Sequence, residues 1–153
     1  MKKLSGAPRL VGVGVLLILP GALLQKLISA APNILPYFPL VSILLLLAWE
    51  WVSYRLADPS ESLLRQALLL CAFGLVMLAL ILYQELIRGA YWQNWLGIGS
   101  QWFFLPWISL AATAVSPFVK ILNVWLVDIV CWMALFLASC LGCLIKRRWS
   151  GLA

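Results

Sequence analysis

Long stretches with almost no charged residue limit the fold of this chain more than any other feature. The clearest stretch, residues 67–83, contains no charged side chain. Over the whole chain 65% of residues are hydrophobic and only 10% are charged, whereas a soluble domain carries about 25% charged residues. A soluble domain, intrinsic disorder and a coiled coil are therefore excluded. The sequence predicts an all-α integral membrane protein, a small polytopic helical bundle that forms one transmembrane domain over residues 1–153.

Five apolar segments compete to cross the membrane, and the favoured arrangement uses four of them. The predicted spans cover about residues 10–28, 36–54, 64–88 and 117–145, and the remaining segment covers about residues 91–115. Because Trp and Tyr prefer the headgroup level, we expect this last, aromatic-rich segment to be interfacial or re-entrant. Asp58-Pro59 and Ser116-Pro117 are typical helix starts and predict helices from Pro59 and Pro117, and Gly89 predicts the end of the first of them.

The basic residues decide the predicted topology. Most of them gather near the chain ends, at Lys2, Lys3, Arg9, Lys146, Arg147 and Arg148. If residues 91–115 do not cross, both termini are cytoplasmic and most basic residues lie inside, as the positive-inside rule requires. Five transmembrane helices leave almost no bias. A rival in which residues 10–28 do not cross fits equally well by charge but leaves almost no connector at residues 115–117.

These observations predict a protein of the cell's inner (cytoplasmic) membrane. Residues 10–28 resemble a signal peptide in part, but Lys26 and Pro32 disfavour cleavage after residues 29–31, so an uncleaved anchor is expected. The net charge of +6 suits anionic lipid headgroups. No basic stripe is interleaved with exposed aromatics, so the lipid bilayer is a predicted partner and nucleic acid is not.

Asp128 is the sharpest candidate for a functional residue. With a helix starting at Pro117, it would lie about 16 Å along the helix, where a carboxylate is costly and usually faces a partner or a cavity. Lys120 and Asp128 share one helix face, and Asn123 lies close by. The functional interpretations are an ion or proton site, or a subunit contact. The alternative is a neutral or hydrogen-bonded carboxylate that only packs. Glu50, between two Trp residues, is the remaining intramembrane polar candidate and is expected to reach water.

Other patterns have mainly structural interpretations. Glu85 and Arg88, spaced i and i+3, are expected to pair. Cys140 and Cys143 form a CxxC without further ligands, so packing is expected, with modification of Cys140 or Cys143 left open. A small-residue helix-packing face is predicted at Ala134, Ala138 and Gly142, for contacts within the bundle or between copies. Interfacial aromatics are predicted at Trp92, Trp95, Trp102 and Trp107.

The sequence favours two functions. It contains no histidine, which removes His-ligated haem, most zinc sites and His general-base catalysis, and we expect no metal or cofactor. The first function is a non-catalytic membrane subunit or interaction protein that stabilises, assembles or modulates a larger complex, with other subunits or itself as partner. The alternative is a small oligomeric transporter or channel using an intramembrane carboxylate. An enzyme is less favoured, since aspartyl chemistry would need a second carboxylate beside Asp128.

Overall fold

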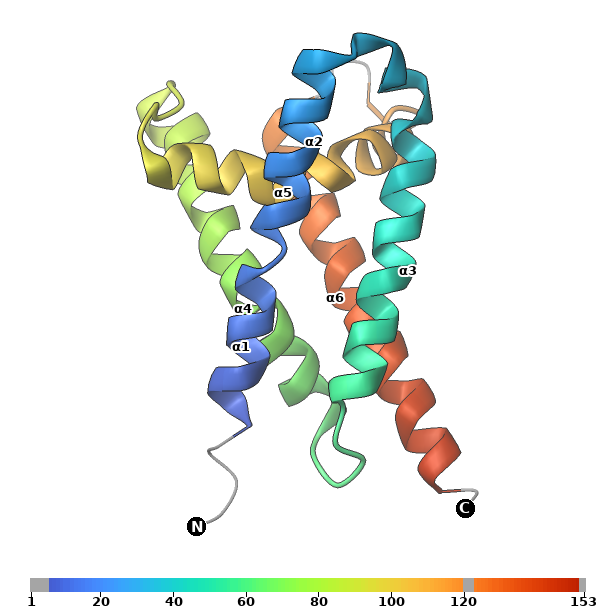
Figure 1. The fold of residues 1–153 in the computed structure, drawn as a ribbon. Coiled ribbons are helices and arrows are strands. Elements are labelled where there is room, and N and C mark those ends of the chain that lie inside the picture. Colours follow the sequence, from blue (N-terminus) through green and yellow to red (C-terminus); the bar gives the residue numbers. More distant parts are fainter. Residues whose placement is uncertain (1–5, 120–122, 152–153) are drawn as a thin grey trace.

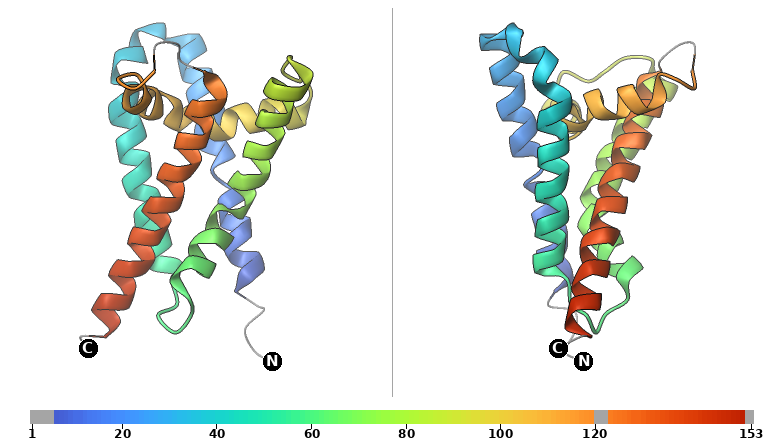
Figure 2. Two further views of the ribbon diagram at one scale, coloured as in Figure 1. Left: turned by 180° about the vertical axis from the view of Figure 1, so that it is seen from behind. Right: turned by 90° about the vertical axis from the view of Figure 1, so that its right-hand side faces the viewer.

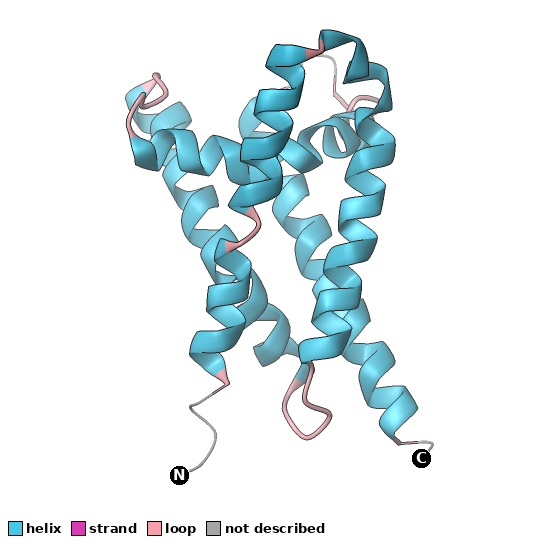
Figure 3. Cartoon of the chain, viewed as in Figure 1, coloured by secondary structure: helices cyan, strands magenta, loops and turns pink. Residues whose placement is uncertain are grey.

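Helices make up all the regular structure in the part of the chain that the computed structural model describes, residues 6–119 and 123–151 (Figures 1 and 3). The elements are α1 (Ala7–Val15), α2 (Ile18–Ala30), the 3₁₀ segment η1 (Pro32–Tyr37), α3 (Phe38–Leu56), α4 (Leu63–Leu82), the π-helical segment η2 (Tyr83–Arg88), α5 (Trp95–Val115) and α6 (Val124–Ser150). Five stretches are long and apolar enough to cross a membrane: Ala7–Ala30, Leu35–Leu56, Leu63–Arg88, Trp95–Val115 and Val124–Ser150. The prediction of an all-helical chain suited to a membrane is confirmed.

Four of these stretches run along the long axis of the bundle, and α5 lies across them. The pair α1 and α2, then α3, α4 and α6, extend between the two ends, whereas α5 crosses them steeply near one end (Figures 1 and 2). α5 contacts α2, α3, α4 and α6. The start of α1 and the end of α6 lie at the opposite end, which we call the termini end; the other is the α5 end.

A break separates α1 from α2, and Pro20 explains its position. Proline has no N–H and its ring clashes with the carbonyl four residues earlier, here that of Leu16. The Leu16 carbonyl instead accepts a tighter bond from the Leu19 N–H, at 3.1 Å. The predicted first span is therefore two short helices joined at residues 16–17, which together run the length of the bundle (Figure 1).

Pro106 helps to hold α5 across the bundle. It cannot donate the hydrogen bond that the Trp102 carbonyl would otherwise accept. That carbonyl packs against Gly21 of α2 so closely that a Cβ at Gly21 would overlap it. The carbonyl of Pro106 itself accepts a hydrogen bond from Ser42 Oγ of α3. Gly21 of α2 and Ser42 of α3 thus both contact the α5 backbone near this proline.

A buried polar contact joins α3 and α6 in the core. Trp49 Nε1 donates to Ser139 Oγ at 2.8 Å, and Cys71 Sγ of α4 lies 3.4 Å from the same oxygen. Ser139 is fully buried. The largest fully buried apolar side chains are Phe103, Phe104, Leu70, Ile81 and Leu135. Since a buried indole N–H needs an acceptor, the Trp49–Ser139 bond fixes the register between α3 and α6.

The small-residue face of α6 is used inside the bundle. A Cβ on Gly142 would meet the backbone of Glu50 and Tyr54, so α6 and α3 are in direct backbone contact there. Ala138 is 8% exposed, and Ala134 lines a small gap between α6, α3 and α5. The sequence leaves two roles open for this face, contacts within the bundle and contacts between copies. These residues make contacts of the first kind.

Two helix starts differ from their predicted positions. The helix predicted to start at Pro59 begins at Leu63, close to the predicted start of its apolar span at about residue 64, because Asp58 Oδ1 accepts hydrogen bonds from Ser60 and forms a turn instead of a helix cap. α6 begins at Val124 rather than Pro117, because α5 continues to Val115 and residues 116–118 form a turn. The predicted stop at Gly89 is confirmed, since this glycine has φ +64°, a left-handed conformation that suits a residue without Cβ.

Candidate functional site

Asp128 lies on the buried face of α6. The side chain is 1% exposed, and its Oδ1 atom accepts no hydrogen bond from any described residue. Because α6 starts at Val124, Asp128 is in its second turn, about 6 Å from the start of the helix. The predicted depth of about 16 Å was wrong for that reason. The carboxylate is therefore near the α5 end and within the bundle.

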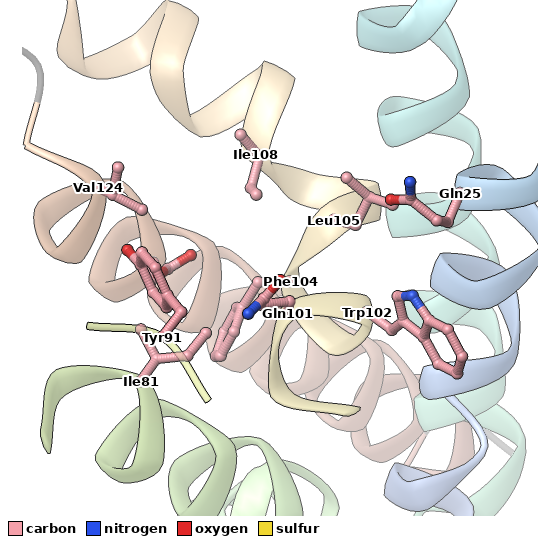
Figure 4. Close-up of a pocket in the computed structure, with 10 residues that line it drawn as sticks. Gln25, Ile81, Tyr91, Gln101, Trp102, Phe104, Leu105, Ile108 and Val124 are labelled. Carbon is pink, nitrogen blue, oxygen red and sulfur yellow. The ribbon is translucent and has the colours of Figure 1, made fainter. Parts of the chain in front are cut away.

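A cavity of about 490 Å³ lies beside Asp128, against one side of the crossing helix α5. Its walls come from α2, α4, α5, α6 and the connection between η2 and α5 (Figure 4). The lining residues are Gln25, Ile81, Tyr91, Gln101, Trp102, Phe104, Leu105, Ile108, Val124 and Asp128. Figure 4 shows Tyr91 and Ile81 on one side of the cavity and Gln25 and Trp102 on the other. Most of the wall is apolar or aromatic, and Asp128 is the one carboxylate among the described lining residues.

The π-helical turn η2 brings a second carboxylate toward this cavity. Gln84 is fully buried and its Oε1 accepts the backbone N–H of Trp92 at 2.7 Å, which fastens the connection that carries Tyr91. Glu85, the next residue, interacts with the Tyr91 hydroxyl as a hydrogen-bond acceptor. Partial burial, the charge of Glu85, this hydrogen bond and the charge of Asp128 together raise the pKa of Tyr91 to about 12. The phenol is therefore a neutral donor at physiological pH.

Glu85, Tyr91 and Asp128 form an acidic cluster at the α5 end. Glu85 and Asp128 are near enough for their charges to repel each other. Glu85 Oε2, like Asp128 Oδ1, is buried and accepts no hydrogen bond from a described residue. The predicted ion pair between Glu85 and Arg88 does not form. In the described part of the chain, the ion pair present joins Arg65 to Glu61. The π-helical turn explains the difference, because its wider spacing changes which residues lie above one another.

The remaining polar candidates are not part of this cluster. Glu50 is half-buried near the termini end, in a surface groove with Tyr54 and Trp149. Asn123 occupies the N-cap position of α6 and is exposed, without a side-chain cap hydrogen bond. Lys120 falls outside the described residues. The structure thus places Asp128 with Glu85 and Tyr91, and places Glu50 at the other end of the bundle.

The four predicted interfacial tryptophans have different environments. Trp95 is 83% exposed, whereas Trp92 and Trp102 are half-buried. Trp107 is 2% exposed, and its indole N–H donates to the Phe103 carbonyl at 3.0 Å. The ring of Trp107 thus belongs to the core, because α5 buries this face against the bundle.

The cysteines are free thiols, with Cys143 buried and Cys140 half-buried. Within residues 6–119 and 123–151, His, Cys, Asp and Glu do not form a group of three that could hold a metal ion. The chemistry available at the site is therefore that of two carboxylates, a phenol and aromatic faces.

Comparison with known proteins finds no matching family model, no matching characterised sequence and no matching solved structure. The site is therefore interpreted from its own residues.

Sequence reasoning missed Glu85 and Tyr91 as site residues. The sequence predicts Glu85 only as the partner of Arg88, and it places Tyr91 only within the aromatic-rich segment 91–115. The missing signal is the π-helical turn, which a 3.6-residue periodicity does not reveal. The adjacent Tyr83-Gln84-Glu85 polar run at the end of an apolar helix is the only local hint of a specialised turn.

Proposed function

We propose that this protein is a small membrane transporter or channel in which Asp128 binds a cation or proton on its path. One observation carries the proposal: a carboxylate oxygen that is buried, lacks a hydrogen-bond partner in the described structure, and borders a cavity. A buried carboxylate oxygen without a hydrogen-bond donor is costly wherever it lies along the helix, so a bound proton or cation is the natural partner.

We propose four crossings, with α5 lying near one membrane surface and both termini in the cytoplasm of a cell with an inner membrane. The steep angle of α5 to the other helices supports this arrangement, as does the positive-inside rule. A periplasmic phosphatase fused after Ala153 is expected to be inactive. An active fusion would overturn the orientation. Because four helices are few for a complete path, the working unit is proposed to be an oligomer.

The transport proposal is tested by flux in proteoliposomes. Purified protein is reconstituted, and proton and monovalent cation fluxes are measured for the wild type, Asp128→Asn and the control Glu50→Gln. Asn keeps the shape of Asp128 but has no charge, whereas Glu50 is a carboxylate at the other end of the bundle. We expect the wild type and Glu50→Gln to conduct or transport, and Asp128→Asn to lose the flux. Equal flux in all three, or none in any, would overturn the proposal.

The second candidate is a non-catalytic subunit that stabilises or modulates a larger membrane complex. Large exposed aromatic side chains at the α5 end favour it, since Trp95 is 83% and Phe118 is 85% exposed, and such residues suit contact with a partner as well as with lipid headgroups. Purification in mild detergent separates the two candidates. A stable hetero-complex supports the subunit, and a homo-oligomer with flux supports the transporter.

A further inference from the structure

We propose that the cavity beside Asp128 and α5 binds a monovalent organic cation, with its ammonium group beside Asp128 and its apolar body against Trp102 and Phe104. This ligand assignment rests on the proposed function only because both use the same cavity. It adds the chemical class of the ligand that binds there.

The size and lining of the cavity favour an organic ligand over a bare metal ion. Its volume of about 490 Å³ is within the roughly 300–1,000 Å³ of small-molecule sites. Calcium requires about 6–8 oxygen ligands at close range. The described lining residues include one carboxylate, that of Asp128, which is too few for a calcium site. Most lining side chains are apolar or aromatic, so most of the ligand surface must be apolar as well.

The charges around the cavity favour a cation. Glu85 Oε2 and Asp128 Oδ1 are both buried without a hydrogen-bond donor among the described residues. No lysine or arginine is found among the described lining residues. A cation beside Asp128 would satisfy its free oxygen and would also reduce the repulsion between Asp128 and Glu85.

Aromatic and amide side chains complete a site for a substituted ammonium group. Tyr91, Trp102 and Phe104 line the cavity, and the face of an aromatic ring attracts a cation, most strongly where water is excluded. Gln25 and Gln101 line it too and are exposed to the surroundings. They mark the side from which a ligand can enter, and their amide carbonyl oxygens can face its positive charge.

Cation binding must compete with protons. The titratable groups around Asp128 are Glu85 on η2, Tyr91 on the following connection and Cys131 one turn along α6. Tyr91 stays neutral through the physiological range. Protonation of Asp128, the carboxylate that lines the cavity, removes attraction for the ligand, and affinity therefore falls as pH falls.

The test uses benzyltrimethylammonium as the probe, with full-length protein in lipid nanodiscs and isothermal titration calorimetry at pH 8 and pH 5. Potassium, calcium and neutral benzyl alcohol are the comparison ligands. We expect saturable binding of the probe alone, and an affinity at least about tenfold weaker at pH 5 and in Asp128→Asn. The matched control Glu50→Gln is expected to bind like the wild type. Circular dichroism and gel filtration check that each variant is folded.

The ligand assignment and the transport proposal can fail separately. Binding of calcium or potassium in place of the probe, or probe binding that is equal at both pH values, overturns the organic-cation site. The pH comparison uses only the wild type, so it holds even if Asp128→Asn does not fold. Probe binding without any flux in proteoliposomes keeps the ligand assignment and overturns transport. Flux of inorganic cations without probe binding does the reverse.

Discussion

Replacement of Gly142 by alanine tests the contact between α3 and α6, and its magnitude follows from the structure. A Cβ at this position would lie 2.9 Å from Tyr54 N and 3.0 Å from Ser53 Cβ, and closer still to the Glu50 carbonyl oxygen. Two of these three atoms belong to the α3 backbone, which cannot rotate away as a side chain can. α3 must therefore move by at least about half an ångström, and such overpacking costs roughly 1–3 kcal/mol.

The gain in helix propensity offsets only part of this cost. Alanine is favoured over glycine in a helix by up to about 1 kcal/mol, so we expect Gly142→Ala to lose about 1–2 kcal/mol in free energy of unfolding. Gly12→Ala in α1 is the matched control, because a Cβ there meets no atom within 4 Å. Its stability should equal or slightly exceed that of the wild type.

Reversible unfolding in mixed SDS and lipid-like detergent micelles, followed by circular dichroism, measures both variants. If Gly142→Ala and Gly12→Ala change the free energy of unfolding equally, the backbone contact between α3 and α6 is wrong. If Gly142→Ala leaves that free energy intact but dissociates an oligomer, the small-residue face of α6 serves contacts between copies instead.

Three further predictions concern single hydrogen-bond donors or acceptors. Ser139→Ala leaves Trp49 Nε1 without its acceptor at 2.8 Å and should lower the free energy of unfolding by roughly 1–2 kcal/mol. In the control Ser150→Ala, which changes an exposed serine, the free energy of unfolding should change little. Equal losses in both variants would contradict the role of the Trp49–Ser139 bond in fixing the register of α3 and α6. Gln84→Met removes the acceptor of the Trp92 N–H, so hydrogen exchange at that amide should accelerate at least about tenfold, equivalent to about 1.4 kcal/mol, and an unchanged exchange rate would contradict the anchoring role of Gln84. The pKa of Tyr91 is raised to about 12, so the contribution of Tyr91 to stability is present below pH 10 and is lost as pH rises through about 12. A titration of absorbance near 295 nm should therefore show a late-ionising tyrosine that disappears in Tyr91→Phe. Ionisation of Tyr91 at pH 10 would contradict the cluster.

Much of the fold could be predicted from residue types because the membrane imposes simple rules. The lack of charge over residues 67–83 predicts a helix there, and Gly89 ends the element that follows it at the predicted place. Helix starts were less predictable. Ser116-Pro117 has the residues of a helix cap, but α5 runs on to Val115 and only a turn occupies the motif, so tertiary packing overrode a local signal.

The site was only half predictable for a related reason. The burial of Asp128 follows from the cost of exposing a carboxylate to lipid, and of the three residues in the cluster the sequence predicts only this one as a site residue. Its neighbours depend on a π-helical turn and on the bond from the Trp92 N–H to Gln84, which bring Glu85 and Tyr91 together. Such contacts join residues across an irregular turn, and no helical or strand periodicity encodes them. The burial of Trp107 has the same origin, since it depends on how α5 lies across the bundle.

Carbodiimide labelling tests most directly whether Asp128 borders a ligand cavity. Dicyclohexylcarbodiimide is an apolar reagent that modifies protonated carboxyl groups, and mass spectrometry of the digested protein identifies the modified residue. The account predicts an adduct at Asp128 that forms more slowly as pH rises and that benzyltrimethylammonium suppresses, while any adduct at Glu50 is unaffected by this cation. Labelling at Glu50 without labelling at Asp128, or labelling of Asp128 that the cation does not change, would contradict it.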